Sequence, residues 1–262
     1  MNILQIVKYY FPSKGGMESV VKDLSDGLCS TDKNINITIY TNSHFPSLKS
    51  TKVVLSNLVV IYEKTLLFFK SQPVRFRYKS LLRLMDEADI IHHHFPYPNI
   101  EVWLLFYKRK LLNKKLIITW HANVENSRWS IVFFLYKPII KRLLSLSENI
   151  VVTSPNLFSS SKILYEFKEK VVVIPLSYNP EISSVSIPRK FPTERIFKIL
   201  FVGKLRKYKG LKYLIEAIKD LNIQLYIIGD GEEKDNLFSL VKFYNLSNKV
   251  FIFNNVSNEG LK

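Results

Sequence analysis

The chain has 262 residues, a formal net charge of +16 and 47% hydrophobic residues, with only 8 Gly and 11 Pro. This composition excludes a disordered tail, a collagen-like repeat and a glycine-rich linker, and the length suffices for one large domain or two of ordinary size. The single cysteine, Cys29, excludes an internal disulfide and a cysteine-based metal cluster, which fits a reducing compartment. The longest apolar run, residues 131–136, is far shorter than the ~20 residues that span a bilayer.

The first part of the chain alternates predicted strands with predicted helices. Short apolar runs, typical of buried parallel strands, occur at Asn2–Lys8, Ile35–Tyr40, Asp89–His93, Leu116–Trp120, Ile150–Thr153 and Val171–Ile174. Between the first two runs, the apolar residues of segment 17–28 recur at helical spacing. Strands that alternate with helices predict a parallel sheet covered on both faces.

Residues 177–192 interrupt this alternation with three Pro and four Ser, and they predict a linker. The alternation then resumes with strands at Lys198–Val202, Gln224–Ile228 and Val250–Phe253 and helices at Leu211–Leu221 and Glu232–Tyr244. The sequence therefore predicts an α/β protein of two Rossmann-like domains with parallel sheets, at 1–187 and 188–262. Because such a domain normally has five or six strands, we expect the second domain to be incomplete or to be completed by a partner.

Two motifs of the first domain contain candidate binding residues. Gly15 and Gly16 follow the first predicted strand, where glycine allows positive φ and a helix N-terminus attracts a phosphate or sugar hydroxyls; a plain tight turn is the alternative. Their spacing is not the dinucleotide fingerprint, so NAD or FAD binding is not predicted. His121 follows strand Leu116–Trp120, at the sheet edge where ligands bind in open α/β folds. It can donate to a developing charge, hold a substrate hydroxyl, or simply pack.

Three consecutive histidines occupy another predicted strand. In a strand, His92 and His94 share one face while His93 points to the other. Two ligands fall short of the three or four of a zinc site, so we expect no metal.

The second domain offers a basic loop and a turn. Loop Gly203–Gly210 has four basic side chains between a strand and a helix, which suits a diphosphate; a solvated loop is the alternative. The turn with Gly229 and Asp230 can approach a nucleotide base or ribose, or be only a turn.

In this order and spacing, the motifs resemble glycosyltransferase family 4, the retaining, nucleotide-sugar-dependent enzymes of GT-B fold. The resemblance covers essentially the whole chain and rests on Tyr10–Pro12, Gly15–Glu18, Asp89–Pro96, Thr119–His121, Ile150–Asn156, Val173–Leu176, Phe201–Leu205, Tyr208–Gly210, Tyr213–Ala217 and Ile228–Gly231. The His-Phe-Pro and Trp-His pieces resemble the subgroup that builds bacterial surface polysaccharides and lipopolysaccharide O-chains, and this subgroup suggests mannose as the transferred hexose.

The resemblance implies a role for each motif. It places His121 near the reacting carbon of the transferred sugar, as the catalytic residue. It assigns donor binding to Gly15, Gly16, Glu18, Lys204, Lys209, Gly229 and Asp230. In this arrangement Lys204 and Lys209 face the first domain across a cleft and stabilise the leaving diphosphate, so neither a metal nor a cofactor is expected.

The chain also departs from the family pattern. It ends before the Glu-x7-Glu segment that holds the donor in the family, Asn126 stands where a basic residue is frequent, and Ser177 stands where Gly is usual. The alternative is therefore an inactive truncated remnant, or half of a split transferase that binds acceptor or partner without turnover.

The resemblance further implies a nucleoside-diphosphate sugar as donor and a polyprenyl-linked glycan as acceptor, in the cytoplasm at the inner face of the plasma membrane. Basic and aromatic stretches at 68–79, Lys108–Lys110 and Lys114–Lys115 suit peripheral binding to an anionic membrane surface, although a solvated surface explains such charges equally well. Because no nucleic-acid-binding motif accompanies the charge, we expect no nucleic acid partner. A second polypeptide that completes the second domain is a further expected partner.

Overall fold

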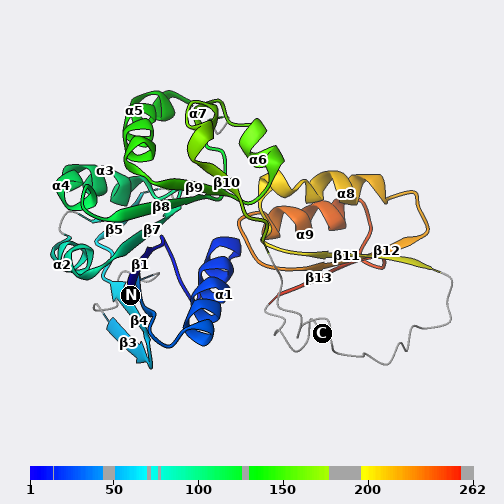
Figure 1. Cartoon of the computed structure of the whole chain (residues 1–262). Coiled ribbons are helices and arrows are strands. Elements are labelled where there is room, and N and C mark those ends of the chain that lie inside the picture. Colours follow the sequence, from blue (N-terminus) through cyan, green and yellow to red (C-terminus); the bar gives the residue numbers. More distant parts are fainter. Residues whose placement is uncertain are drawn as a thin grey trace. The chain divides into compact units, whose positions relative to one another are not determined.

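The protein is described from a computed structural model. It describes residues 1–13, 15–43, 51–69, 72–75, 78–125, 130–176 and 196–254. The chain divides into two compact units, unit 1 at Met1–Ser177 and unit 2 at Tyr178–Lys262 (Figure 1). The sequence-based domain boundary at 187/188 and the whole of the predicted linker fall outside the described residues, so both stay predictions.

Unit 1 is built on a sheet whose described strands have the order β10-β9-β8-β7-β1-β2-β4-β3, and within this order only β3 runs antiparallel to its neighbour. The bounds are β1 (Asn2–Ile6), β2 (Asn36–Asn42), β3 (Thr51–Leu55), β4 (Leu58–Glu63), β7 (Ile90–Phe95), β8 (Lys115–Trp120), β9 (Asn149–Val152) and β10 (Val171–Val173). The separate strands β5 (Leu67–Phe69) and β6 (Gln72–Val74) pair with each other. The strands predicted for this unit are confirmed, whereas β3 to β6 were not predicted.

Helices cover both faces of this sheet, as predicted. Helix α1 (Gly16–Thr31) packs on one face, where Ile3 of β1 and Ile37 of β2 form an apolar cluster with Val21. On the opposite face, Leu4 and Ile6 of β1 join a larger cluster with α2 (Lys79–Glu87), α3 (Pro98–Phe106) and α5 (Ser130–Leu146). The alternation of residues 3, 4 and 6 between the two clusters follows from the period of two in a strand. The shorter helices are α4 (Lys108–Leu111), α6 (Pro155–Ser159), α7 (Lys162–Tyr165) and the 3-10 turn η1 (Lys168–Lys170).

The strand order reverses beside β1, because β2 pairs with one edge of β1 and β7 with the other. In open α/β sheets, the loops that leave the carboxyl ends of the strands diverge at such a point and form a crevice that binds ligands. The carboxyl ends of β1, β7 and the adjacent β8 therefore frame the candidate site of unit 1.

The described part of unit 2 has a parallel sheet of β11 (Phe197–Val202), β12 (Ile223–Ile228) and β13 (Val250–Phe253), with α8 (Leu211–Ala217), α9 (Lys234–Phe243) and the 3-10 turn η3 (Lys207–Lys209). The three strands and the two α-helices are elements that the sequence predicts, whereas η3 was not predicted. One face of the sheet packs against both helices, through Leu225 and Ile227. On the other face Leu200 and Val202 are 63% and 52% exposed.

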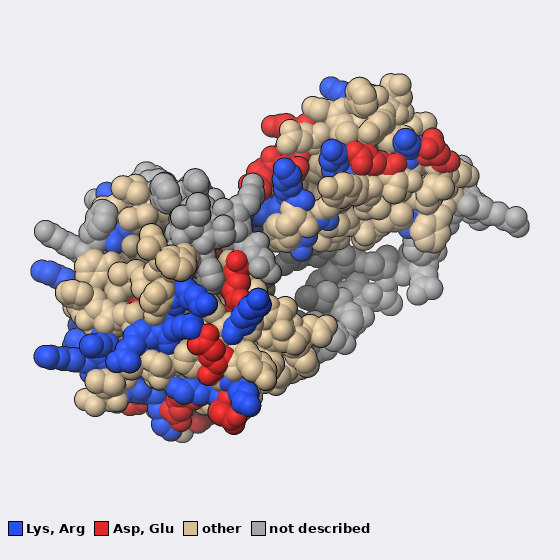
Figure 2. Space-filling model, turned by 90° about the horizontal axis from the view of Figure 1, so that it is seen from above, with Lys and Arg blue, Asp and Glu red and all other residues tan. Residues whose placement is uncertain are grey.

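Charge is distributed differently on the two units. On unit 1, the face seen in Figure 2 gathers Lys and Arg side chains into one broad region, whereas on unit 2 basic and acidic side chains alternate. In the parts of the chain that the structure describes, no helix combines the length and apolar character that crossing a bilayer requires.

Candidate functional site

The two glycines after β1 form the start of α1. Gly15 is the N-cap in extended backbone, with φ −170° and ψ 169°, and Gly16 is the first helical residue. The sequence-based expectation that this pair supplies positive φ is therefore wrong, since the described glycines with positive φ are Gly203, Gly210 and Gly231. Gly15 is instead distinguished by the Glu18 side chain, which lies close to its Cα. A Cβ on Gly15 would lie 2.3 Å from a carboxylate oxygen of Glu18.

Glu18 determines which ligand group suits this helix start. It lies in the first turn of α1, where a negative charge interacts favourably with the helix dipole. Burial, reinforced by the Glu18 charge, raises the pKa of Tyr9 to about 12. Because a carboxylate already occupies this N-terminus, its attraction for a phosphate is reduced. Sugar hydroxyls therefore fit the turn at Gly15 and Gly16 better than a phosphate does.

Polar side chains from three neighbouring strands are hydrogen-bonded on one face of the sheet. His94 Nε2 lies 2.7 Å from Gln5 Oε1 of β1, and His94 Nδ1 lies 2.9 Å from His121 Nε2. His92 Nε2 lies 2.7 Å from Thr119 Oγ1 of β8. The rings of His92 and His94 are 4.4 Å apart, which confirms that these two histidines share a face. The structure thus places the side chains of Gln5 and His94 in one hydrogen-bonded group with His121. The sequence analysis did not predict this grouping.

His93 points to the opposite face, as predicted. Its Nε2 lies 2.9 Å from Glu101 Oε1 of α3, and both side chains are fully buried. The same carboxylate oxygen accepts a hydrogen bond of 2.7 Å from the Tyr97 backbone N–H. His93 therefore ties the sheet to α3 within the core of unit 1.

The histidines on the site face are neutral near pH 7. Burial, with repulsion from His93, lowers the pKa of His121 to about 4. Burial, with repulsion from the neighbouring histidines, lowers the pKa of His94 well below its ordinary value and that of His92 to about 3. A neutral imidazole has one donor and one acceptor nitrogen. Of the chemical roles that the sequence left open for His121, this state favours holding a hydroxyl over acting as a cation.

The loop after β8 is held in place by residues that sequence reasoning missed. The His121 backbone N–H donates to the Phe95 carbonyl oxygen at 3.1 Å, and the Trp120 indole N–H donates to Asn123 Oδ1 at 2.7 Å. The Glu125 carboxylate accepts hydrogen bonds from the Ser161 hydroxyl and from the first backbone N–H groups of α7. Polar residues directly after a strand end are the signal that identifies such anchors.

In unit 2 the basic loop packs against the following turn. The Leu205 N–H donates to the Asp230 carbonyl oxygen, and the Glu233 N–H donates to the Leu205 carbonyl oxygen, both at 3.0 Å. A Cβ on Gly229 would lie 1.9 Å from the Gly203 carbonyl oxygen, so only glycine fits there. Packing between two backbones therefore explains Gly229 without a ligand, while the Asp230 side chain is exposed.

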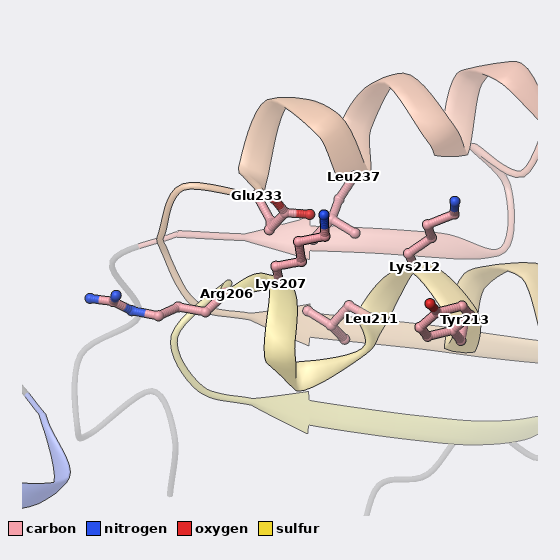
Figure 3. Close-up of a pocket in the computed structure, with 7 residues that line it drawn as sticks. All are labelled: Arg206, Lys207, Leu211, Lys212, Tyr213, Glu233 and Leu237. Atoms are coloured by element: carbon pink, nitrogen blue, oxygen red, sulfur yellow. The ribbon is translucent and has the colours of Figure 1, made fainter. Parts of the chain in front are cut away.

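The basic side chains of the loop divide into two groups. Arg206 and Lys207 line a pocket of about 70 Å³ together with Leu211, Lys212, Tyr213, Glu233 and Leu237 (Figure 3). Lys204 and Lys209 are exposed and do not line this pocket; the Lys209 ammonium lies 5.3 Å from the ring centre of Tyr208. The predicted arrangement in which Lys204 and Lys209 face the first domain stays a prediction.

Most of the chain matches two families of known proteins. Residues 14–182 match the family described as Glycosyltransferase Family 4, and residues 186–262 match the family described as Glycosyl transferases group 1.

Two curated relatives resemble most of the chain. The O-antigen chain mannosyltransferase C of Escherichia coli is 31% identical over 260 residues, which cover 96% of this chain and 67% of the relative. The D-rhamnosyltransferase WbpZ of Pseudomonas aeruginosa is 28% identical over 261 residues, which cover 96% of this chain and 65% of the relative. The chain thus spans about two thirds of the length of these relatives.

Solved structures share the fold. Sucrose-phosphate synthase from Thermosynechococcus elongatus superposes with a TM-score of 0.70 at 18% identity, covering 99% of this chain and 72% of that one. HepE of Anabaena, in complex with UDP and glucose, gives a TM-score of 0.65 at 15% identity, covering 98% and 70%. At identities this low, the structural matches show the fold alone. They confirm the predicted GT-B-like fold class.

Proposed function

The chain belongs to glycosyltransferase family 4, and we propose that it acts in sugar transfer for cell-surface polysaccharide synthesis, moving a hexose from a nucleoside-diphosphate sugar to a lipid-linked glycan with retention of configuration. The observation that carries the proposal is His121: it is neutral, lies at the carboxyl end of β8 beside the strand-order reversal, and is anchored through His94 to β1. The named activity of the E. coli relative favours mannose as the hexose.

Five of the candidate residues have a task in this proposal. His121 holds a hydroxyl of the transferred sugar, and the N–H groups at Gly15 and Gly16 bind further hydroxyls. When the bond between the anomeric carbon and the diphosphate oxygen breaks, the diphosphate leaves with the electron pair and gains negative charge. The ammonium groups of Lys204 and Lys209 stabilise that charge, so the step needs no metal or cofactor. The acceptor hydroxyl oxygen forms the new bond to the anomeric carbon, and its proton passes to the oxygen of the departing diphosphate.

A transfer assay with nucleoside-diphosphate hexoses and a polyprenyl-linked glycan tests these roles. We expect His121→Ala and Lys209→Ala each to lower kcat/KM by about 100-fold, the usual cost of removing one group that stabilises the transition state. Lys207→Ala is the matched control, because Lys207 lies in the same loop but lines the pocket of Figure 3, and we expect a change within about twofold. Wild-type rates in both test variants would overturn the site assignment. The anomeric configuration of the product, read by NMR, decides between retention and inversion.

A second candidate function is binding without turnover, as one part of a transferase completed by a second polypeptide. It is favoured by the sheet of unit 2, where Leu200 and Val202 are more than half exposed on the face that faces away from α8 and α9. Parallel sheets are normally covered on both faces. If this candidate is right, the chain isolated from its own cells sediments with a second polypeptide, and Leu200→Asp releases that polypeptide. A monomer that transfers sugar excludes this candidate.

We also propose that unit 1 binds an anionic membrane through the α3–α4 patch, which comprises Phe106, Lys108, Arg109 and Leu112. Phe106 and Leu112 are 75% and 66% exposed, and the two basic residues between them are exposed as well. Apolar side chains beside cations suit the interface of an anionic bilayer. Of the other basic residues suggested by the sequence, Lys110 and Lys114 both bind Asp86.

The described part of residues 68–79, the other stretch that the sequence suggested for membrane binding, offers fewer exposed side chains than expected. Tyr78 is 1% exposed in the core, so its expected place on the surface is wrong. Lys70, Phe76 and Arg77 lie outside the described residues.

Flotation with vesicles tests the α3–α4 patch. We expect the protein to float with vesicles that contain anionic phospholipid and to stay behind with neutral ones. Phe106→Ser combined with Arg109→Ser should weaken flotation by about tenfold, whereas Tyr165→Ser, which removes another exposed aromatic ring from unit 1, should not change it. Equal flotation of all these proteins would refute the assignment.

A further inference from the structure

The hydrogen-bonded row Gln5, His94 and His121 connects β1, β7 and the first residue after β8, which are distant in the sequence. Gln5 and His94 are fully buried, whereas His121 is only partly buried. The two links are 2.7 Å and 2.9 Å between heavy atoms, both within the range of good hydrogen bonds. The row therefore runs from the interior of unit 1 to the carboxyl edge of its sheet.

We propose that His94, backed by Gln5, is a positioning residue that fixes the tautomer of His121, with the proton on Nε2 and a lone pair on Nδ1 that accepts a hydrogen bond from a sugar hydroxyl. The identity of the bound hydroxyl rests on the proposed function, whereas the tautomer does not.

The proton positions follow one another along the row. The Gln5 amide is oriented with Oε1 toward His94, and its Nε2 is buried without a hydrogen-bond partner. Because an amide oxygen can only accept, His94 Nε2 carries the proton and donates it. A neutral His94 has no second proton, so its Nδ1 accepts. The partner of that nitrogen, His121 Nε2, must then donate, which leaves His121 Nδ1 unprotonated. Of the described residues, none hydrogen-bonds to His121 Nδ1.

The burial of Gln5 and His94 disfavours any other arrangement of the protons along the row. The opposite tautomer of His94 would set the lone pair of Nε2 against that of Gln5 Oε1 at 2.7 Å, in a place without access to water. A protonated His94 is disfavoured because burial and the neighbouring histidines lower its pKa well below the ordinary value. With the Gln5 amide oxygen facing His94, as in the structure, both departures from the proposed order are therefore costly.

This tautomer determines which ligand group His121 can bind. An unprotonated Nδ1 accepts a hydrogen bond from a hydroxyl and repels a phosphate oxygen, which has only lone pairs to offer. His121 is then specific for the hydroxyl-bearing part of the donor, and a deoxy analogue that lacks this hydroxyl loses affinity. Sites built to bond a substrate hydroxyl reject analogues without it strongly.

Long-range ¹H–¹⁵N correlation NMR on protein labelled at histidine nitrogen reads the tautomer directly. The chain has five histidines, and His121→Gln identifies the His121 signals by their loss. We expect the pattern of a proton on Nε2 for His121 in the wild type. In Gln5→Leu and in His94→Phe we expect a mixture of both tautomers, because the acceptor that fixes the proton is lost. In His94→Asn the amide oxygen stands near the position of Nδ1, so we expect the wild-type pattern.

Thr119→Val is the matched control, since it removes a histidine hydrogen bond of equal length on the same face that does not involve His121. In the transfer assay, His94→Phe should lower kcat by about tenfold, the worth of one positioning hydrogen bond, and His94→Asn should restore most of it. A proton on His121 Nδ1 in the wild type, or an unchanged pattern in both Gln5→Leu and His94→Phe, would overturn the inference. If the tautomer shifts as expected but no sugar is transferred, the positioning stands and the proposed function fails.

Discussion

The contact between Gly229 and Gly203 gives a substitution whose cost can be worked out from the structure. In Gly229→Ala the new Cβ would lie 1.9 Å from the Gly203 carbonyl oxygen, whereas carbon and oxygen atoms approach to roughly 3.3 Å. The two loops must therefore separate by more than 1 Å or so. Such a shift breaks the hydrogen bonds of 3.0 Å that link Leu205 to Asp230 and to Glu233. With about 1–2 kcal/mol for each, we expect unit 2 to lose about 3 kcal/mol of stability.

Hydrogen exchange followed by mass spectrometry measures this loss in the right unit. All three tryptophans lie at positions 103, 120 and 129, so tryptophan fluorescence reports on unit 1 alone. We expect amides of β11 and β12 to exchange about 100-fold faster in Gly229→Ala, while the fluorescence transition of unit 1 stays unchanged.

Gly16→Ala is the matched control, because a Cβ there meets nothing within 4 Å at a helical position. We expect this substitution to be neutral or to stabilise unit 1 by about 0.5 kcal/mol. Exchange in β11 and β12 that stays within a few-fold of wild type in Gly229→Ala would refute the contact.

Two further predictions concern unit 1. Because His92, His94 and His121 titrate below their unfolded value of about 6.5, the unfolded chain binds more protons between pH 6.5 and 4, and stability is lost as the pH falls through that window. Urea unfolding of His94→Asn should show a slope against pH, between pH 5 and 6, that is smaller than wild type by about 1.4 kcal/mol per pH unit; equal slopes would contradict the neutral buried state. Glu125→Ala should cost about 1–3 kcal/mol in urea unfolding, since three donors at the start of α7 lose their acceptor. Glu169→Ala, at a side chain 87% exposed, should stay within about 0.5 kcal/mol, and equal costs for the two would disprove the capping role.

Local patterns in the sequence determine the elements and the faces of strands, which is why the predicted strands and the opposed directions of His92 and His93 agree with the structure. The antiparallel strand β3 lies at the sheet edge with all five residues exposed, so no apolar periodicity marks it. β4 has the apolar run of a buried strand and could have been predicted.

The candidate site was less accessible to sequence reasoning, because it depends on how distant strands pair. A period of two places His94 on a face, but only the register of β1 with β7 and of β7 with β8 brings Gln5 and His121 to it. Glycine is similarly ambiguous: the sequence suggests positive φ at Gly15, whereas the structure uses that glycine in extended backbone beneath a carboxylate. A contact between two backbone segments, such as that of Gly229 with Gly203, is marked in the sequence only by the glycine itself.

Calorimetric titration with GDP, UDP and their hexose conjugates tests most directly whether this chain recognises a nucleoside diphosphate through Lys204 and Lys209. We expect weak binding by the wild type, a further loss of about tenfold or more in the double variant Lys204→Ala with Lys209→Ala, and little change in Lys207→Ala with Lys212→Ala, whose side chains line the pocket of Figure 3. Affinity that is the same in the wild type and the Lys204/Lys209 variant, or that falls only in the pocket variant, would contradict the proposed donor site.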